Sequence, residues 1–172
     1  MHETFGQDFV HKTKQLAQLL CAQGARLACA ESCTGGLLSA QLTAVAGASQ
    51  WFEAAYITYS NAAKQNDLGV SAHTLERYGA VSEQTALEMA KGVLERLGQV
   101  DFAVSITGVA GPDGGTADKP VGMVCFAFAR RLATGQMSNE AVTRHFSGSR
   151  AQIRTQAVGY VLDSCLQRLA EL

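Results

Sequence analysis

The sequence predicts a single three-layer α/β/α domain over residues 1–172, built on a mixed, largely parallel sheet. Three observations support this fold class. After a first helix, the chain continues with a strand, a helix and a second strand, as in a parallel β-α-β unit. Residues 121–129 form an almost unbroken apolar run, which is typical of a central strand covered on both faces. The last two predicted strands follow each other directly, which makes the sheet a mixed one.

The first half of the chain contains two predicted strands and the helices around them. Apolar residues at helical spacing predict a helix over 8–23, and Gly24 is suited to its C-terminal cap. A short apolar strand over 26–30 leads into the turn "ESCTGG". An i, i+4, i+7 apolar pattern after that turn predicts a helix closed by Gly47. A second strand is predicted over 52–60, and the ten residues after it as a loop or a short helix.

The second half begins with the clearest helix of the sequence. Ser82 is a favourable N-cap, apolar residues follow with a 3.6-residue period, and Gly98 ends the pattern. Ser149 is expected to cap the last helix of the chain. Three strands are predicted between these helices, over 101–107, 121–129 and 138–146. The last of the three is more polar than the others and is expected at an edge of the sheet.

Charge and hydropathy argue against two classes of partner. The formal net charge is −1, so the protein has no overall field that attracts nucleic acid or an acidic membrane. No apolar run approaches the roughly 20 residues that span a bilayer, and the amino terminus lacks an apolar signal core. Only 17% of the residues are charged, which suggests that a subunit interface hides part of the surface. We therefore expect a homo-oligomer, with a dimer as the expected form.

The cysteines and histidines do not indicate a metal site. The five cysteines form no C-x-x-C pair, and most of them lie in apolar stretches. They are typical of reduced cysteines in a cytoplasmic protein rather than of a disulfide framework. The four histidines are scattered and form no H-E-x-x-H motif. We expect a cytoplasmic protein that needs no metal and no redox cofactor.

Three polar or glycine-rich segments follow predicted strands. They are "ESCTGG" (31–36), "TYSNAAK" (58–64) and "TGVAGPDGGTADKP" (107–120). Ligands of α/β sheets gather at the carboxyl ends of parallel strands. If these strands run parallel, the three segments meet at one edge of the sheet and form a site.

Ser32 is the first candidate nucleophile. It stands at a strand end, and the N–H groups of Thr34, Gly35 and Gly36 are expected in the first turn of the next helix, where they could hold an oxyanion. The alternative is that the serine or the threonine only caps the helix. Cys33 is the rival nucleophile, but no nearby histidine is available to lower the pKa of its thiol.

Tyr59 and Lys64 are the candidate activating groups for Ser32. A lysine shielded from water loses its charge more easily and can act as a base, while a tyrosine can relay a proton. The alternative is that Lys64 is a solvated surface charge. G-x-S-x-G is absent, which argues against the α/β-hydrolase elbow, and S-x-x-K is absent too. The five-residue step from Tyr59 to Lys64 also differs from the Tyr-x-x-x-Lys spacing of short-chain dehydrogenases.

The glycine-rich segment is a candidate phosphate cradle. Its successive backbone N–H groups could surround a phosphate, Lys119 could add a positive charge, and Thr107 could bind a ligand at the strand end. It is not a Walker A motif, and a flexible loop is the alternative. Near the last helix, Arg150 and Arg154 share one helix face and could bind phosphate, although exposed arginines often bind nothing.

Six segments together resemble the CinA carboxy-terminal domain family, the nicotinamide-nucleotide amidases. They occur in family order between about residues 29 and 154, which is most of the chain. The segments are "AESCTGG", "YSNAAKQNDLGV", "GAVSEQTALEMAKG", "SITGVAGPDGG", "KPVGMVCFAFA" and "FSGSRAQIR". No single segment would suffice alone, but six in order make a specific match.

The resemblance implies hydrolysis of nicotinamide mononucleotide to nicotinic acid mononucleotide and ammonia, within pyridine nucleotide recycling. It implies Ser32 as the nucleophile and Tyr59 with Lys64 as its activating groups. The nucleotide would be held by the glycine-rich segment, around Gly108, Gly111, Gly114 and Gly115. Many family members carry an extra amino-terminal domain, which this chain is expected to lack. The alternative from another class is a nucleotide-binding regulatory module without catalysis, which would not require the serine, tyrosine and lysine.

Overall fold

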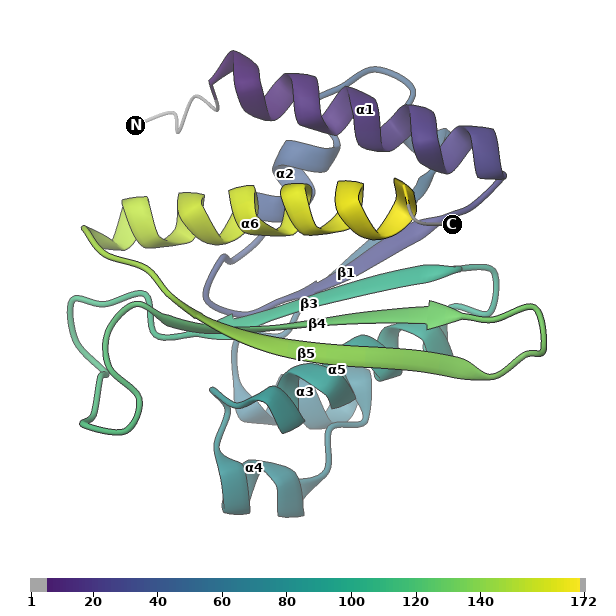
Figure 1. The fold of residues 1–172 in the computed structure, drawn as a ribbon. Coiled ribbons are helices and arrows are strands. Elements are labelled where there is room, and N and C mark those ends of the chain that lie inside the picture. Colours follow the sequence, from purple (N-terminus) through teal and green to yellow (C-terminus); the bar gives the residue numbers. More distant parts are fainter. Residues whose placement is uncertain (1–5, 171–172) are drawn as a thin grey trace.

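The protein, described here by a computed structural model over residues 6–170, is built on one five-stranded sheet with the order β2-β1-β3-β4-β5 (Figure 1). β2, β1 and β3 pair parallel, whereas β4 pairs antiparallel with β3 and with β5. Four of the five strands therefore point the same way, which confirms the predicted fold class. The strands are β1 (Leu27–Glu31), β2 (Phe52–Ile57), β3 (Phe102–Gly108), β4 (Met123–Arg131) and β5 (Met137–His145).

Helices cover both faces of the sheet and complete the three layers (Figure 1). The layer drawn above the sheet contains α1 (Gln7–Gln23), α2 (Leu37–Leu42) and α6 (Arg150–Ala170). The layer drawn below it contains α3 (Asn61–Leu68), α4 (Ala72–Tyr78) and α5 (Glu83–Arg96). A short 3-10 helix, η1 (Ala48–Gln50), leads into β2.

The sheet divides the core in two because successive side chains of a strand point to opposite faces. In β4, Val124, Phe126 and Phe128 pack in the cluster formed with α1, α2 and α6. The small residues that alternate with them pack in the second cluster, under α5. This alternation explains why the sequence of β4 is apolar almost throughout, as a strand buried on both faces must be.

Two helices differ from the sequence prediction. α2 ends at Leu42 instead of continuing to Gly47, although Val45 is buried, as the apolar spacing suggested. A turn therefore buries Val45, and apolar spacing alone did not distinguish that turn from a helix. α4 was not predicted because it is short and has no long apolar period. Its one local signal is Ser71, whose hydroxyl accepts a hydrogen bond from the N–H of Thr74 and caps the helix.

The three parallel strands end side by side, as the site prediction required. Their hydrogen-bond ladders continue one residue beyond the strands on both sides of β1. The N–H of Ser32 donates to the carbonyl of Ile106 at 2.9 Å, and the N–H of Thr58 donates to the carbonyl of Glu31 at 2.9 Å. The segments after β1, β2 and β3 therefore leave the sheet from fixed positions next to each other.

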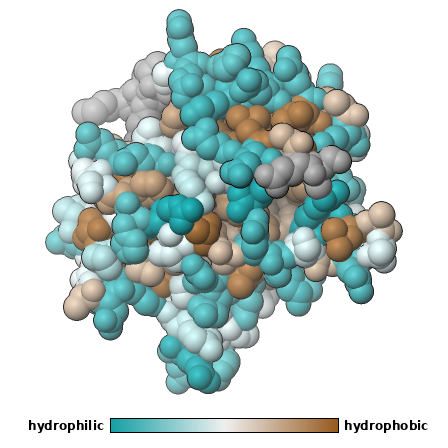
Figure 2. Space-filling model, viewed as in Figure 1, coloured by the Kyte–Doolittle hydropathy of each residue, from teal (hydrophilic) through white to brown (hydrophobic). Residues whose placement is uncertain are grey.

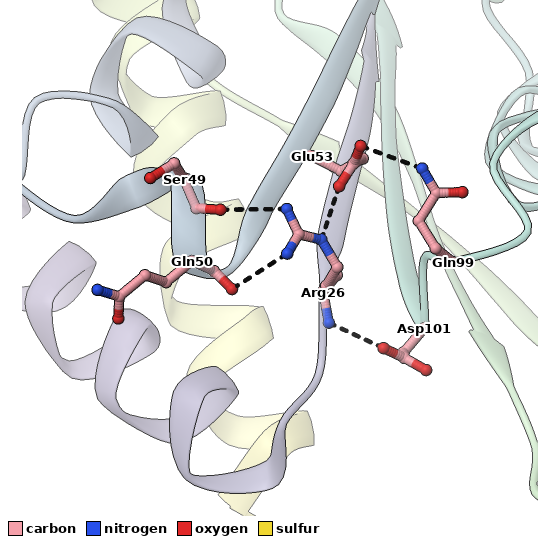
Figure 3. A network of polar contacts seen from close by, with 6 residues as sticks. All are labelled: Arg26, Ser49, Gln50, Glu53, Gln99 and Asp101. Carbon is pink, nitrogen blue, oxygen red and sulfur yellow. Dashed lines mark hydrogen bonds and ion pairs between the residues drawn. The ribbon is translucent and has the colours of Figure 1, made fainter.

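A polar network around Arg26 holds the opposite end of the sheet (Figure 3). The backbone N–H of Arg26 donates to Asp101 at 2.8 Å, and its Nε donates to Glu53 at 2.6 Å. Hydrogen bonds from Gln99 and from Arg26 lower the pKa of the Glu53 carboxyl. The guanidinium also donates to two carbonyls of η1, those of Ser49 and Gln50. Arg26 thus ties the starts of β1, β2 and β3 to η1.

Gly92 of α5 allows a close contact with α3, so Gly92→Ala is expected to destabilise the protein. A Cβ at this position would lie 2.0 Å from the carbonyl oxygen of Leu68, at the end of α3. Alanine would favour the helix by about 1 kcal/mol, but relief of such an overlap costs about 1–3 kcal/mol or more. We expect the free energy of unfolding to fall by about 2 kcal/mol, measured by urea denaturation.

Gly98 provides the matched control for Gly92→Ala. A Cβ at Gly98 would meet no atom within 4 Å, and the residue does not have a positive φ. Gly98→Ala is therefore expected to unfold like the unaltered protein. Equal stability of the two variants would contradict the close α3–α5 contact.

The surface shows no continuous hydrophobic area on the face drawn in Figure 2. Hydrophobic residues there form separate patches between hydrophilic ones, and the largest lies beside α1. This face therefore gives no support to the dimer predicted from the low charge. Among residues 6–170, no helix has both the length and the hydropathy of a membrane span.

Candidate active site

A cleft of about 280 Å³ lies where the three parallel strands end. All three segments predicted to form a site contribute to it, so their predicted meeting is confirmed. The connection before α5 and the first residue of α6 complete its walls. The lining residues are Ser32, Cys33, Tyr59, Lys64, Ala80, Val81, Thr107, Gly108, Val109, Ala110, Gly111, Asp113, Gly114 and Arg150.

Ser32 and Lys64 are in direct contact at the bottom of this cleft. The Nζ of Lys64 lies 2.9 Å from the Oγ of Ser32. Both residues are buried, with 8% of Ser32 and 1% of Lys64 exposed. A separation of 2.9 Å is within the range of about 2.6–3.2 Å in which a base can take a proton from a hydroxyl. The alternative of a solvated surface lysine is therefore wrong.

The local sequence explains how Lys64 reaches the strand end. Ser60 caps α3 immediately after β2, and its hydroxyl accepts a hydrogen bond from the N–H of Ala63. Lys64 consequently lies in the first turns of α3, where side chains lean back towards the helix N-terminus. Its Nζ donates to the carbonyls of Thr58 at 2.7 Å and of Tyr59 at 3.1 Å, both in the segment that follows β2.

The surroundings of Lys64 favour its neutral form. Burial lowers the pKa of Lys64 from 10.5 to about 8. Its hydrogen-bond partners are two carbonyls and one hydroxyl, and none of them carries a charge that would hold the ammonium. A substantial fraction of Lys64 is therefore neutral near physiological pH, and a neutral amine can accept the proton of Ser32.

Tyr59 lines the cleft, but its hydroxyl does not take part in the Ser32–Lys64 contact. The side chain is 61% exposed, and its hydroxyl accepts a hydrogen bond from Nη2 of Arg150 at 3.0 Å. Within residues 6–170, Tyr59 contacts Lys64 by a hydrogen bond only through its backbone carbonyl. These contacts do not support the predicted role of Tyr59 as a proton relay in this arrangement.

Glu31 occupies one of the three predicted oxyanion donors, the N–H of Gly36. Glu31 is fully buried, and its carboxylate accepts from the N–H groups of Gly36, Leu38 and Ser39 at 2.9–3.1 Å. Prediction from the sequence missed this role, although the acid directly before Ser32 was visible. A carboxylate is a strong acceptor for the free N–H groups of a helix start, so it caps α2 and fixes the turn that carries Ser32.

One of the three predicted oxyanion donors has no acceptor within the described residues. The N–H of Gly35 donates to the carbonyl of Ser32, and that of Gly36 donates to Glu31. In the part of the chain that the structure describes, the N–H of Thr34 has no such acceptor. Thr34 is nevertheless fully buried, and none of the three predicted donors lines the cleft.

The glycine-rich segment lies only partly at the cleft. Gly108, Gly111 and Gly114 line it, whereas Gly115 and Lys119 do not. A turn in which the N–H of Thr116 donates to the carbonyl of Lys119 directs the lysine away, and its Nζ donates to the carbonyl of Tyr78 at the end of α4. These contacts do not support the predicted role of Lys119 in phosphate binding.

Thr107 and Arg150 hold the walls of the cleft in place. The hydroxyl of Thr107 donates to the carbonyl of Ala80 at 2.7 Å and so anchors the connection before α5. Nη1 of Arg150 donates to the carbonyl of Gly111 at 2.8 Å, while its Nη2 reaches Tyr59. Arg150 thus joins the glycine-rich segment to the segment after β2.

Cys33 is not a competitive nucleophile. Burial raises the pKa of its thiol to about 12, so very little thiolate is present at neutral pH. This agrees with the ranking of Ser32 above Cys33. Asp113, Ala80 and Val81 line the cleft although no role was predicted for them. The acid within "GPDGG" was a visible signal, whereas the two apolar residues had no signal in the sequence.

A larger cavity, of about 450 Å³, lies near the other end of the sheet, between β3, β4, β5 and the C-terminal part of α6. Its lining includes Phe102, Phe128 and Cys165, and burial raises the pKa of the Cys165 thiol to about 12. Among the described residues that line this cavity, no nucleophilic side chain is hydrogen-bonded to a side chain that could act as its base. The smaller cleft is therefore the candidate active site, because it contains the Ser32–Lys64 pair.

Comparison with known proteins gives consistent matches over most of the chain. Residues 10–169 match the CinA C-terminal domain family. The chain is 50% identical over 156 residues to the nicotinamide-nucleotide amidohydrolase PncC of Enterobacter agglomerans, covering 89% of this chain and 90% of that protein. It is 44% identical over 164 residues to the PncC of Escherichia coli K12, covering 95% and 96%.

Solved structures agree with the fold. A CinA superfamily protein from Klebsiella pneumoniae superposes with a TM-score of 0.88 at 38% identity, covering 95% of this chain and 99% of that one. The competence/damage inducible protein CihA from Agrobacterium tumefaciens superposes with a TM-score of 0.88 at 39% identity, covering 98% and 99%. The resemblance found in six short segments therefore extends over nearly the whole chain.

Proposed function

Because this chain belongs to the CinA C-terminal domain family, we propose that it is a nicotinamide-nucleotide amidohydrolase. The reaction converts nicotinamide mononucleotide and water into nicotinic acid mononucleotide and ammonia. Two relatives with 44–50% identity over most of the chain carry the name of this activity. The single observation that supports it most strongly is the 2.9 Å contact between Ser32 and a buried lysine with a lowered pKa.

In the proposed first half-reaction, neutral Lys64 takes the proton of Ser32 while Oγ attacks the carboxamide carbon. The ammonium of Lys64 then returns a proton to the leaving nitrogen, and the C–N bond breaks to release ammonia. Ser32 is left as an ester of the nicotinate group.

In the proposed second half-reaction, Lys64 removes a proton from water, and the resulting hydroxide attacks the ester carbon. The C–O bond to Ser32 breaks, and the proton returns from Lys64 to Oγ. One lysine thus serves as base and as acid in both halves, as in other serine–lysine systems. No charge has to be brought into the cleft besides that of the substrate.

The rest of the cleft suits a pyridine nucleotide. Ala80, Val81, Val109 and Ala110 give it an apolar wall that suits the pyridine ring. Of the two predicted phosphate ligands Lys119 and Arg150, only Arg150 lines the cleft, and its guanidinium suits the phosphate. At Gly114 an added Cβ would meet no atom within 4 Å, which leaves room for a ligand to approach the backbone closely.

The proposal is tested with the purified protein and nicotinamide mononucleotide. We expect release of one ammonia per nicotinic acid mononucleotide formed, measured by a coupled ammonia assay and by chromatography. Free nicotinamide, which lacks ribose and phosphate, is the control and is expected to react far more slowly. If nicotinamide mononucleotide binds without ammonia release, the protein is the non-catalytic nucleotide-binding module.

The dimer and the cytoplasmic location stay predictions. The dimer is supported only by the low fraction of charged residues, 17%. The location is supported by the five cysteines, all of which are free thiols. Sedimentation equilibrium tests the first prediction, and fractionation of cells tests the second.

A further inference from the structure

Asp113 is an acidic side chain at the cleft that has no partner of its own. The charged residues that line the cleft are Lys64, Asp113 and Arg150. Lys64 bonds to Ser32, and Arg150 bonds to Gly111 and Tyr59. Across residues 6–170, the exposed carboxylate of Asp113 forms neither a hydrogen bond nor an ion pair. It is therefore an acceptor available to a ligand.

The chain around Asp113 is held against the rest of the protein. Arg150 donates to the carbonyl of Gly111, two residues before Asp113. Gly111 also packs so closely that an added Cβ would lie 2.5 Å from Cγ1 of Val121. These contacts keep the segment beside the cleft, so the carboxylate is placed there before a ligand binds.

The chemistry of the substrate limits what this carboxylate can bind. An ionised carboxylate only accepts hydrogen bonds. The phosphate of nicotinamide mononucleotide would repel it. The pyridinium ring carries a positive charge that attracts the carboxylate, but it has no N–H to donate. The carboxamide has N–H groups, but catalysis requires it at Ser32. The remaining donors of the substrate are the two hydroxyls of the ribose.

We propose, on the basis of the proposed function, that Asp113 accepts a hydrogen bond from a ribose hydroxyl of the substrate and so determines its specificity for the ribonucleotide. The small size of the cleft, about 280 Å³, supports a direct contact. Sites for small molecules usually measure about 300–1,000 Å³. A nucleotide whose carboxamide is at Ser32 therefore fills the cleft and brings its sugar against the lining residues.

The test combines two substitutions with three substrates. Asp113→Ala removes the carboxylate at the cleft, and Asp118→Ala removes one from the same exposed segment that does not line the cleft. The substrates are nicotinamide mononucleotide and its 2′-deoxy and 3′-deoxy analogues. The kcat/KM of ammonia release is measured for each combination of protein (unaltered or variant) and substrate. Thermal unfolding verifies the fold of both variants.

We expect Asp113→Ala to lower kcat/KM for nicotinamide mononucleotide about tenfold, which is typical of one lost hydrogen bond to a charged group. The analogue that lacks the bonded hydroxyl should react alike with the unaltered protein and with Asp113→Ala. Asp118→Ala should match the unaltered protein on all three substrates.

Two results would overturn the inference in distinguishable ways. If Asp113→Ala lowers kcat/KM equally on all three substrates, or does not lower it at all, Asp113 does not contact the ribose. The proposed amidase activity is unaffected by either result. A general disturbance of the loop would produce the equal loss. If the unaltered protein releases no ammonia from nicotinamide mononucleotide, the proposed function fails and this inference fails with it.

Discussion

Ser32→Ala is expected to lower the rate of ammonia release by about 10⁴-fold or more, because it removes the atom that would attack the carboxamide. The fold should persist, since the hydroxyl makes one hydrogen bond and Lys64 keeps its two carbonyl acceptors. We expect a loss of about 1 kcal/mol in the free energy of unfolding. Single-turnover assays with nicotinamide mononucleotide and urea denaturation measure the two quantities.

Cys33→Ala is the matched control for Ser32→Ala. Cys33 is the next residue, lines the same cleft and is 6% exposed. Because burial raises the pKa of its thiol to about 12, its removal should leave most of the activity. If Ser32→Ala retained near-normal turnover while Cys33→Ala lost it, the thiol would be the nucleophile and the assignment of Ser32 would be wrong.

The parts of the site that could be predicted from the sequence depend on local rules. Ser32 follows a buried strand, and Lys64 follows Ser60, a serine suited to cap a helix. Strand ends and helix starts of this kind are visible in a sequence. The only long-range assumption was that the strands run parallel, and the pairing of β1 with β2 and β3 confirms it.

The parts that could not be predicted depend on where a side chain turns after its segment is placed. Glu31 folds back over the turn that follows it and takes the N–H of Gly36, which was predicted to hold an oxyanion. Lys119 lies in the glycine-rich segment, yet a turn directs it to α4. The hydroxyl of Tyr59 bonds to Arg150, which is 91 residues away. No spacing in the sequence encodes these three contacts.

The pH dependence of the unaltered protein tests the role of Lys64. The active form carries a neutral amine, and burial lowers the pKa of Lys64 to about 8. Activity should therefore rise with pH, reach half its maximum near pH 8 and level off above it. An unperturbed lysine would place this midpoint near 10.5. We expect the rise in kcat/KM of the free enzyme, measured between pH 6 and pH 10.

Lys64→Met and Lys64→Arg separate a base from a simple positive charge. Methionine fills much of the same volume without an amine, so kcat should fall by about 10³-fold or more and the rise near pH 8 should disappear. Arginine keeps a positive charge but does not lose its proton, so it should be equally inactive. Circular dichroism verifies that both variants fold. Substantial activity in Lys64→Arg would mean that the ammonium only stabilises charge, and another group would then have to deprotonate Ser32.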